Sequence, residues 1–193
     1  MDRMAVLLCM SAAFAAAPAA GEPDAEIRAE LAALCQKDFC REASPIRLKL
    51  PNGETFAMTP TSPTPIVAGG MVTVYPGETV LVEATEEEGR LTRLTAVQTA
   101  RHPERTLTFR LTQEASIGDG TGMVLKVDSP FAGVIKYRLG MMLPSREDLL
   151  RTSACPLRGG QASYEHWPHP IFQIVAADFR LVDSESKAAT TCE

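Results

Sequence analysis

Apolar and polar residues alternate in short runs along most of the chain beyond residue 45. Residues 106–112 are the clearest case, because Leu107, Phe109 and Leu111 alternate with threonine and arginine. A period of two places alternate side chains on opposite faces, so this segment predicts a strand with one face in the core. The same kind of pattern predicts strands at 46–50, 54–58, 71–74, 79–84, 91–99, 123–127 and 134–142.

Residues 171–182 form a longer run that is apolar on both faces in its first half. Such a strand belongs in the middle of a sheet that is covered on both sides. Turns rich in Gly, Pro, Asn and Asp separate the strands at intervals of about 8–12 residues. Together these features predict a mainly β fold: an antiparallel β-sandwich, immunoglobulin-like in general architecture, with one short N-terminal helix.

The helix is predicted at residues 22–38, where Ile27, Leu31 and Leu34 recur at the spacing of one helical face. We interpret residues 20–43 as this helix and a cysteine clasp, and residues 44–183 as the sandwich domain. Three prolines exclude a central strand at 59–65, which we interpret as an extended connector. Residues 184–193 form a polar tail that is mobile unless a cysteine in it is bonded.

The first residues predict an export signal. An apolar run at 4–17 is followed by Ala17-Pro18-Ala19, a small-residue pattern that suits a signal peptidase, so residues 1–19 are interpreted as a signal peptide. The alternative is a buried N-terminal helix. No other apolar segment approaches membrane length, so no membrane insertion is expected after cleavage. We therefore expect a periplasmic or secreted protein, of bacterial source.

Cleavage would leave an even number of cysteines, which in an exported chain favours disulfides. Cys35, Cys40, Cys155 and Cys192 allow three pairings. The favoured one joins Cys35 to Cys40, with the helix ending between them, and Cys155 to Cys192. The alternative joins the N-terminal helix to Cys155.

The net charge of −5 leaves no basic field that would match a phosphate backbone. Nucleic acid is therefore excluded as a predicted partner. The loop at 117–122 lacks the spaced acids of a calcium loop and the motif of a nucleotide-phosphate site, so we interpret it as a hairpin loop.

Residues 143–170 interrupt the regular series of strands, and at 28 residues they exceed an ordinary hairpin loop. Ser145 resembles a helix cap, which predicts one or two helical turns at 146–151. The rest is expected to be a long irregular loop. It contains the only tryptophan, Trp167, and two of the three histidines.

The favoured function is non-catalytic binding of an unknown protein or small ligand through this end of the sandwich. Aromatic and arginine side chains are enriched at interfaces, and the candidates are Tyr164, Trp167, Arg158 and Phe172. The alternative is that the loop caps the core, buries Trp167 and binds nothing.

A second hypothesis is a periplasmic copper or zinc protein. Prolines at 168 and 170 favour extended geometry, in which His166 and His169 would lie on the same side at a spacing of three. The third ligand would be Glu165, or Met141 or Met142 for copper. Otherwise no cofactor is expected.

A third hypothesis is a small secreted hydrolase, because Ser163, Glu165 and His166 supply the residue types of a catalytic triad. Adjacent residues on an extended chain point apart, however, and the sequence has no Gly-x-Ser-x-Gly motif. The enzyme question is open from the sequence, and the residues favour a protein without catalytic activity.

Overall fold

The computed structural model describes residues 25–193 except residues 37, 43 and 61–62. The predicted signal peptide therefore lies outside the described residues. The helices and strands are α1 (Ala25–Cys35), β1 (Cys40–Arg41), β2 (Ile46–Lys49), β3 (Thr55–Met58), β4 (Thr64–Pro65), β5 (Val67–Ala68), β6 (Met71–Val74), β7 (Thr79–Glu87), β8 (Arg90–Val97), β9 (Thr106–Glu114), β10 (Gly122–Asp128), β11 (Val134–Met142), β12 (Leu150–Thr152), β13 (Ala162–Trp167) and β14 (Gln173–Val182). Short 3-10 turns lie at Pro103–Arg105, Gly118–Gly120 and Lys187–Thr190.

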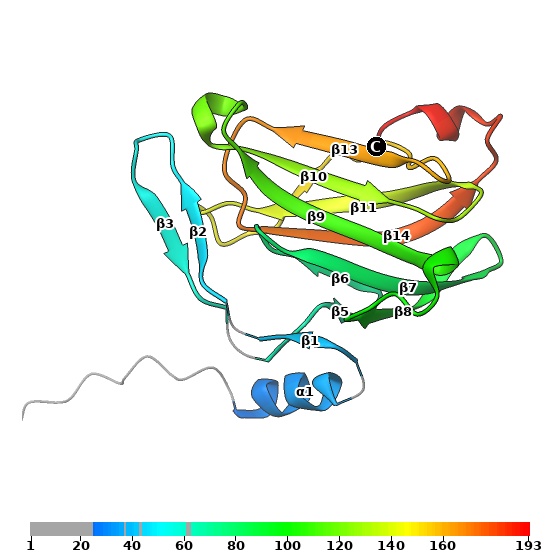
Figure 1. The fold of residues 1–193 in the computed structure, drawn as a ribbon, viewed down its shortest axis with the longest axis horizontal. Helices are drawn as coiled ribbons and strands as arrows, with labels where there is room; N and C mark the ends of the chain where they lie inside the picture. The colour runs from blue at the N-terminus through cyan, green and yellow to red at the C-terminus, as the bar shows by residue number, and fades with distance from the viewer. Residues whose placement is uncertain (1–24, 37, 43, 61–62) are drawn as a thin grey trace, which may run out of the picture.

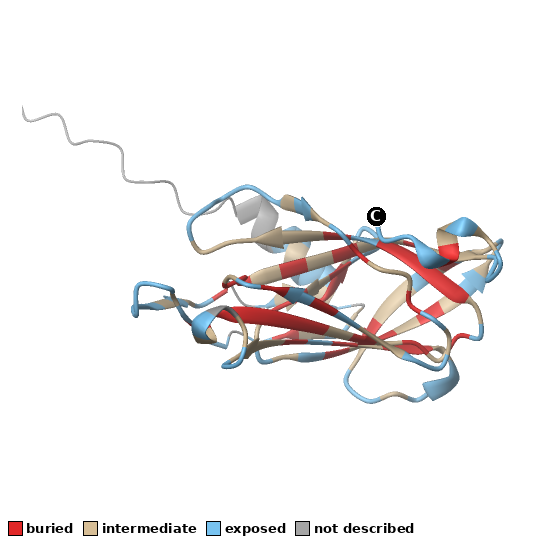
Figure 2. Cartoon of the chain, turned by 90° about the horizontal axis from the view of Figure 1, so that it is seen from above, coloured by how far each residue is buried: buried red, intermediate tan, exposed pale blue. Residues whose placement is uncertain are grey.

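The strands form an antiparallel β-sandwich (Figure 1). The hydrogen-bonded order is β12-β11-β14-β8-β7-β9-β10-β13, while β6 pairs with β14 and β5 pairs with β6. β14 and β8 are joined through one residue pair, Arg180 with Arg90, so the sheet turns a corner there. The two resulting layers face each other, and buried residues follow strands of both (Figure 2). The mainly β antiparallel fold is confirmed, and its likeness to immunoglobulin domains stays a prediction.

The core forms where the predicted alternation is cleanest. Leu107, Phe109 and Leu111 on β9 are fully buried. Phe179 of β14 packs edge-on against Phe109, with ring centroids 6.1 Å apart, and stacks on Tyr137 of β11 at 5.8 Å. These aromatic contacts connect the two layers and supply a large apolar area to the core.

β14 lies inside the sheet, as predicted, between β11 on one side and β6 and β8 on the other. It begins two residues later than predicted. Val175 and Ala177 on its outer face are only half-buried, so the prediction that other residues cover both faces of this strand is wrong. Asp178 has a φ of +60°, and the register with β11 shifts there. This bulge places Phe179 on the same face as Ile174 and Ala176, which simple alternation did not predict.

Residues 143–170 are not one irregular loop. The predicted helix at 146–151 is wrong, because Leu150–Thr152 forms β12 and pairs with the edge of β11. Ala162–Trp167 forms β13 and pairs with β10. An isolated helix of one or two turns is marginal, whereas an extended segment beside an open sheet edge gains ladder hydrogen bonds.

Both favoured disulfides are present: Cys35 with Cys40, and Cys155 with Cys192. The helix ends at Cys35, as the first pairing requires. Leu34, on its predicted apolar face, is exposed. No helix in the described part of the chain is long and apolar enough to cross a membrane.

The polar tail is folded onto the sandwich. Cys192 is bonded to Cys155, and Ala154 and Glu193 exchange two backbone hydrogen bonds of 2.8 and 3.0 Å. Ala189, in the last 3-10 turn, is buried. The sequence predicted a mobile tail unless its cysteine is bonded, and Cys192 is bonded.

Candidate functional site

The β2–β3 hairpin stands apart from the sandwich as a two-stranded sheet (Figure 1). Its turn is Pro51-Asn52-Gly53, in which Gly53 has a φ of +85° and the Asn52 side chain accepts a hydrogen bond from the Glu54 N–H at 3.0 Å. These residues favour a tight turn, because Gly and Asn tolerate such conformations. The predicted hairpin is confirmed, with strands one residue shorter than expected.

The hairpin is fixed to the sandwich at two places. Gln113 at the end of β9 bonds to the backbone of Lys49 twice: it accepts from the N–H at 2.8 Å and donates to the carbonyl at 3.0 Å. Phe56 of β3 lies against Phe172, with ring centroids 5.5 Å apart. The hairpin therefore has a defined position relative to the end of the sandwich.

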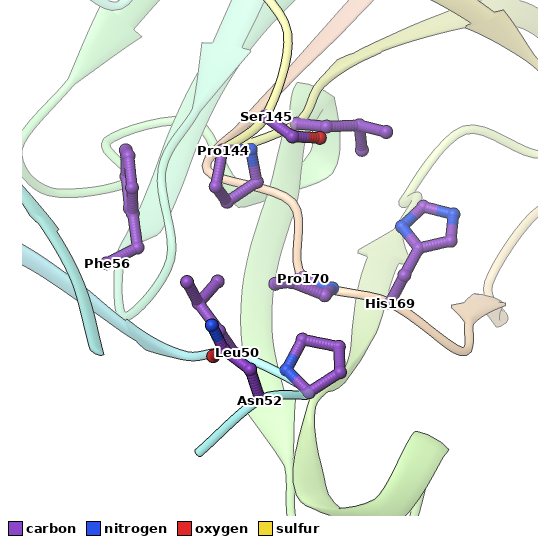
Figure 3. Close-up of a pocket in the computed structure, with 9 residues that line it drawn as sticks. Leu50, Asn52, Phe56, Pro144, Ser145, His169 and Pro170 are labelled. Carbon is purple, nitrogen blue, oxygen red and sulfur yellow. The ribbon is translucent and has the colours of Figure 1, made fainter. Parts of the chain in front are cut away.

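A cavity of about 450 Å³ lies between the hairpin and the sandwich end (Figure 3). We call it the hairpin pocket, and its lining consists of Leu50, Pro51, Asn52, Phe56, Leu143, Pro144, Ser145, His169 and Pro170. Most of these side chains are apolar, and the three prolines offer no backbone N–H. The volume is within the range of small-molecule sites.

One polar group in this pocket lacks a partner. Nδ1 of His169 is buried and makes no hydrogen bond within the described part of the chain. Phe56 and His169 lie on opposite sides of the pocket in Figure 3, with Leu50, Pro144 and Pro170 between them. A buried polar atom without a partner is uncommon, which makes His169 the candidate polar group of this mainly apolar site.

The predicted binding residues are divided between core and surface. Trp167 is 7% exposed, and its indole N–H donates to the Thr152 hydroxyl at 2.9 Å, so it belongs to the core. Phe172 is buried behind Phe56. Tyr164 is exposed on the outer face of β13, and Arg158 is exposed in the turn before this strand. Their binding role stays a prediction.

The predicted metal ligands point in different directions. β13 continues through Trp167, so the polyproline geometry expected from residue 166 onward is wrong. His166 is exposed on the outer face of this strand, Glu165 is buried on the inner face, and His169 lines the hairpin pocket. Among the described residues, no group of three or more His, Cys, Asp or Glu is placed to hold a metal ion.

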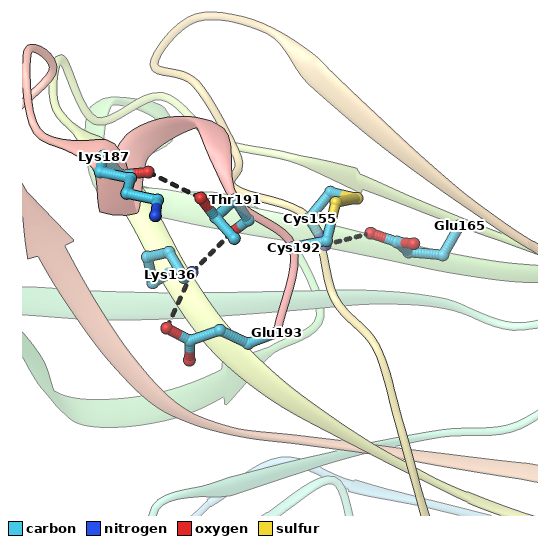
Figure 4. The surroundings of a disulfide bond; sticks show 7 residues. All are labelled: Lys136, Cys155, Glu165, Lys187, Thr191, Cys192 and Glu193. Atoms are coloured by element: carbon cyan, nitrogen blue, oxygen red, sulfur yellow. Dashed lines mark hydrogen bonds and ion pairs between the residues drawn. A yellow bond between two sulfur atoms is a disulfide. The ribbon is translucent and has the colours of Figure 1, made fainter.

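Glu165 has a structural partner (Figure 4). Its Oε1 accepts a hydrogen bond of 2.6 Å from the Cys155 N–H, next to the Cys155–Cys192 disulfide. Burial raises the pKa of Glu165, while the Cys155 N–H and His166 partly oppose the rise. Burial also raises the pKa of Tyr137, and the nearby Glu165 adds to that effect. The carboxyl group is therefore part of the interior of the sandwich.

The predicted triad residues do not assemble. Glu165 and His166 lie on opposite faces of β13, as neighbouring residues of a strand must. Ser163 lies on the inner face of β13 with Glu165, near the Tyr137 hydroxyl, which makes no hydrogen bond among the described residues. His166 therefore points away from both Ser163 and Glu165, which gives no support to the hydrolase hypothesis.

The hairpin pocket was missed because its walls are far apart in the sequence. Leu50, Leu143 and His169 come from three segments, each of which could be recognised only as a turn or a strand end. The sequence features that could have pointed to this pocket are the Pro51-Asn52-Gly53 turn and the prolines at 144 and 170. Nothing in those features shows that the three segments meet.

No family model, curated protein or solved structure matches this chain. Function is therefore inferred from the geometry of the sites themselves.

Proposed function

We propose that this protein is an exported, non-catalytic binding protein that takes a small apolar ligand in the hairpin pocket. The observation that carries the proposal is the cavity of about 450 Å³, with its mainly apolar lining and the unpartnered Nδ1 of His169. A pocket with apolar walls and few polar groups is the usual form of a small-molecule site.

The ligand has an aromatic or aliphatic ring and one hydrogen-bonding group. The ring packs between Leu50, Phe56 and Leu143, where it is removed from water. The polar group bonds to His169, which then no longer has an unsatisfied buried nitrogen.

The lining also supports binding rather than catalysis. Ser145 and His169 both border the pocket, but no hydrogen bond joins them in the described structure. The lining includes no carboxylate that would orient the imidazole as a base.

The two disulfides support a location in the periplasm or outside the cell, because such bonds persist in oxidising compartments. A signal peptide at residues 1–19 fits the same location.

Ligand-observed NMR with a set of aromatic fragments tests the proposal. We expect fragments to bind the wild-type protein and the Tyr164→Ala control, which changes an exposed residue on the outer face of β13. Ser145→Trp, which fills the mouth of the pocket, should abolish binding. His169→Phe should weaken fragments with a hydrogen-bonding group by about fivefold and leave purely apolar fragments unchanged.

Binding that survives Ser145→Trp would show that the fragments bind elsewhere, and the proposal would be wrong. The same holds if no fragment binds the folded wild-type protein. Near-UV circular dichroism of each variant establishes that it is folded.

A further inference from the structure

A second surface runs from the outer face of the layer that contains β12, β11, β14 and β6 onto β8, at the corner where β8 meets β14. Two hollows of about 230 and 500 Å³ adjoin there and share Met71 and Ala177 in their linings. We call this surface the arginine face, because Arg90, Arg93, Arg138 and Arg151 line its two hollows.

The strand register assembles this face. Gly140 on β11 is paired with Arg151 of β12 on one side and with Val175 of β14 on the other. Two residues away on β11, and on the same face, Arg138 is paired with Ala177 of β14. Directly opposed residues share a face, so arginine side chains flank a floor of small and apolar residues.

The floor is apolar and exposed. Met71 and Leu149 are 45% and 53% exposed, and both line the smaller hollow. Leu149 lies over Gly140, where a Cβ atom would be 2.9 Å from the leucine Cγ. Glycine at 140 therefore allows the leucine to lie flat beside the arginines.

The charges on this face are unbalanced. The linings contain four arginines and one carboxylate, Asp178, although the chain has a net charge of −5. Both oxygens of Asp178 are engaged: Arg90 lies 2.7 Å from Oδ1, and Nε of Arg138 lies 3.4 Å from Oδ2. Arg93 pairs with Glu87 at 3.0 Å, and Arg151 has no ion pair among the described residues.

We propose that the arginine face binds an acidic segment of a partner protein, independently of the hairpin pocket. Aliphatic side chains of the segment lie on Met71 and Leu149, and its carboxylates pair with Arg138 and Arg151. Guanidinium groups match carboxylates in two-point geometry, and arginine with methionine is typical of protein interfaces. A purely electrostatic site would not need the exposed apolar floor.

Fluorescence anisotropy with a labelled peptide of repeated Glu-Leu-Glu units tests the proposal. We expect this peptide to bind more tightly than a Glu-Ser-Glu or a Lys-Leu-Lys peptide, and to bind more weakly as salt increases. Arg138→Gln/Arg151→Gln should weaken binding about tenfold or more. The matched control, Arg47→Gln/Arg110→Gln, removes two exposed arginines from other strands and should bind like the wild type.

Met71→Ser provides a second, uncharged variant and should weaken the Glu-Leu-Glu peptide without affecting the Glu-Ser-Glu peptide. Equal loss in the Arg138/Arg151 and control variants would overturn the proposal. So would preferential binding to phosphatidylglycerol vesicles, or sedimentation showing that this face joins two copies of the chain. Fragment binding to the hairpin pocket is measured on the same variants and should not change, so the two proposals can fail separately.

Discussion

Lys136 is buried beneath the C-terminal segment, outside the hydrophobic core between the two layers (Figure 4). The side chain is 1% exposed, and Nζ lies 2.7 Å from the Thr191 carbonyl oxygen and 2.8 Å from Oε1 of Glu193. Arg180 lies 2.7 Å from the other oxygen of Glu193. Lys136, and secondly Arg180, lower the pKa of this carboxyl, so the ion pair persists into mildly acidic solution. A buried ammonium requires such a partner.

Glu165 gives the opposite pH dependence. Its pKa is raised by burial, so the ionised form is disfavoured in the folded protein. Its contribution to stability is full below the ordinary carboxyl pKa, about 4.3, and is lost as the pH rises through the higher pKa of the folded state. A neutral amide would avoid this loss and could still accept from the Cys155 N–H.

We therefore expect Glu165→Gln to unfold at a higher urea concentration than the wild type at neutral pH, and at the same concentration near pH 3. Urea unfolding across this pH range measures the difference, with Glu42→Gln, an exposed position, as the control. A wild-type and Glu165→Gln difference that does not vary with pH would contradict the assignment.

At the scale of elements, residues 183–193 complete the sandwich. They supply both acceptors for Lys136, the buried Ala189, the pairing with Ala154 and one half of the second disulfide. Release of this segment would remove both acceptors of the Lys136 ammonium. The disulfide at Cys192 therefore anchors the two residues that bind Lys136.

The two disulfides should differ in their effect on stability. Cys155 and Cys192 are 37 residues apart, and removal of this bond should lower the free energy of unfolding by about 3–4 kcal/mol. Cys35 and Cys40 are 5 residues apart, so their removal should cost about 2 kcal/mol or less. Urea unfolding of the two paired Cys→Ser variants measures both values.

Limited proteolysis shows whether the Cys155–Cys192 bond stabilises the protein by holding residues 183–193 in place. New cleavage within residues 183–193 is expected only when Cys155 and Cys192 are replaced. Equal losses of stability in the two variants, without new cleavage, would show that the segment is held by other contacts.

The elements also show where sequence patterns succeed and fail. Hairpins such as β2–β3 were predicted because their turn residues act locally. β12 and β13 were missed because an extended segment pairs only where a sheet edge is available, and the position of that edge is a tertiary property. The bulge at Asp178 was missed for a related reason, since it depends on the facing residues of β11.

At the scale of the whole molecule, Trp167 reports on the assembled core. It extends from β13 to Thr152 at the end of β12, so its environment exists only when the two layers are joined. Tryptophan fluorescence should be blue-shifted and insensitive to acrylamide in the folded protein. Far-UV circular dichroism should report the same urea midpoint, because one core connects both layers. Midpoints that differ would show that the layers unfold separately.

Hydrophobic alternation and turn residues are local properties, and from them the sequence by itself determined the β class and most strand positions. The cysteine count favoured the observed disulfides but left three pairings open. The hairpin pocket, the arginine face and the partner of Lys136 each combine segments that are distant in the chain. Only the tertiary structure decided these, because strand pairing and layer packing set which side chains meet, and alternation along a single strand specifies faces without specifying neighbours.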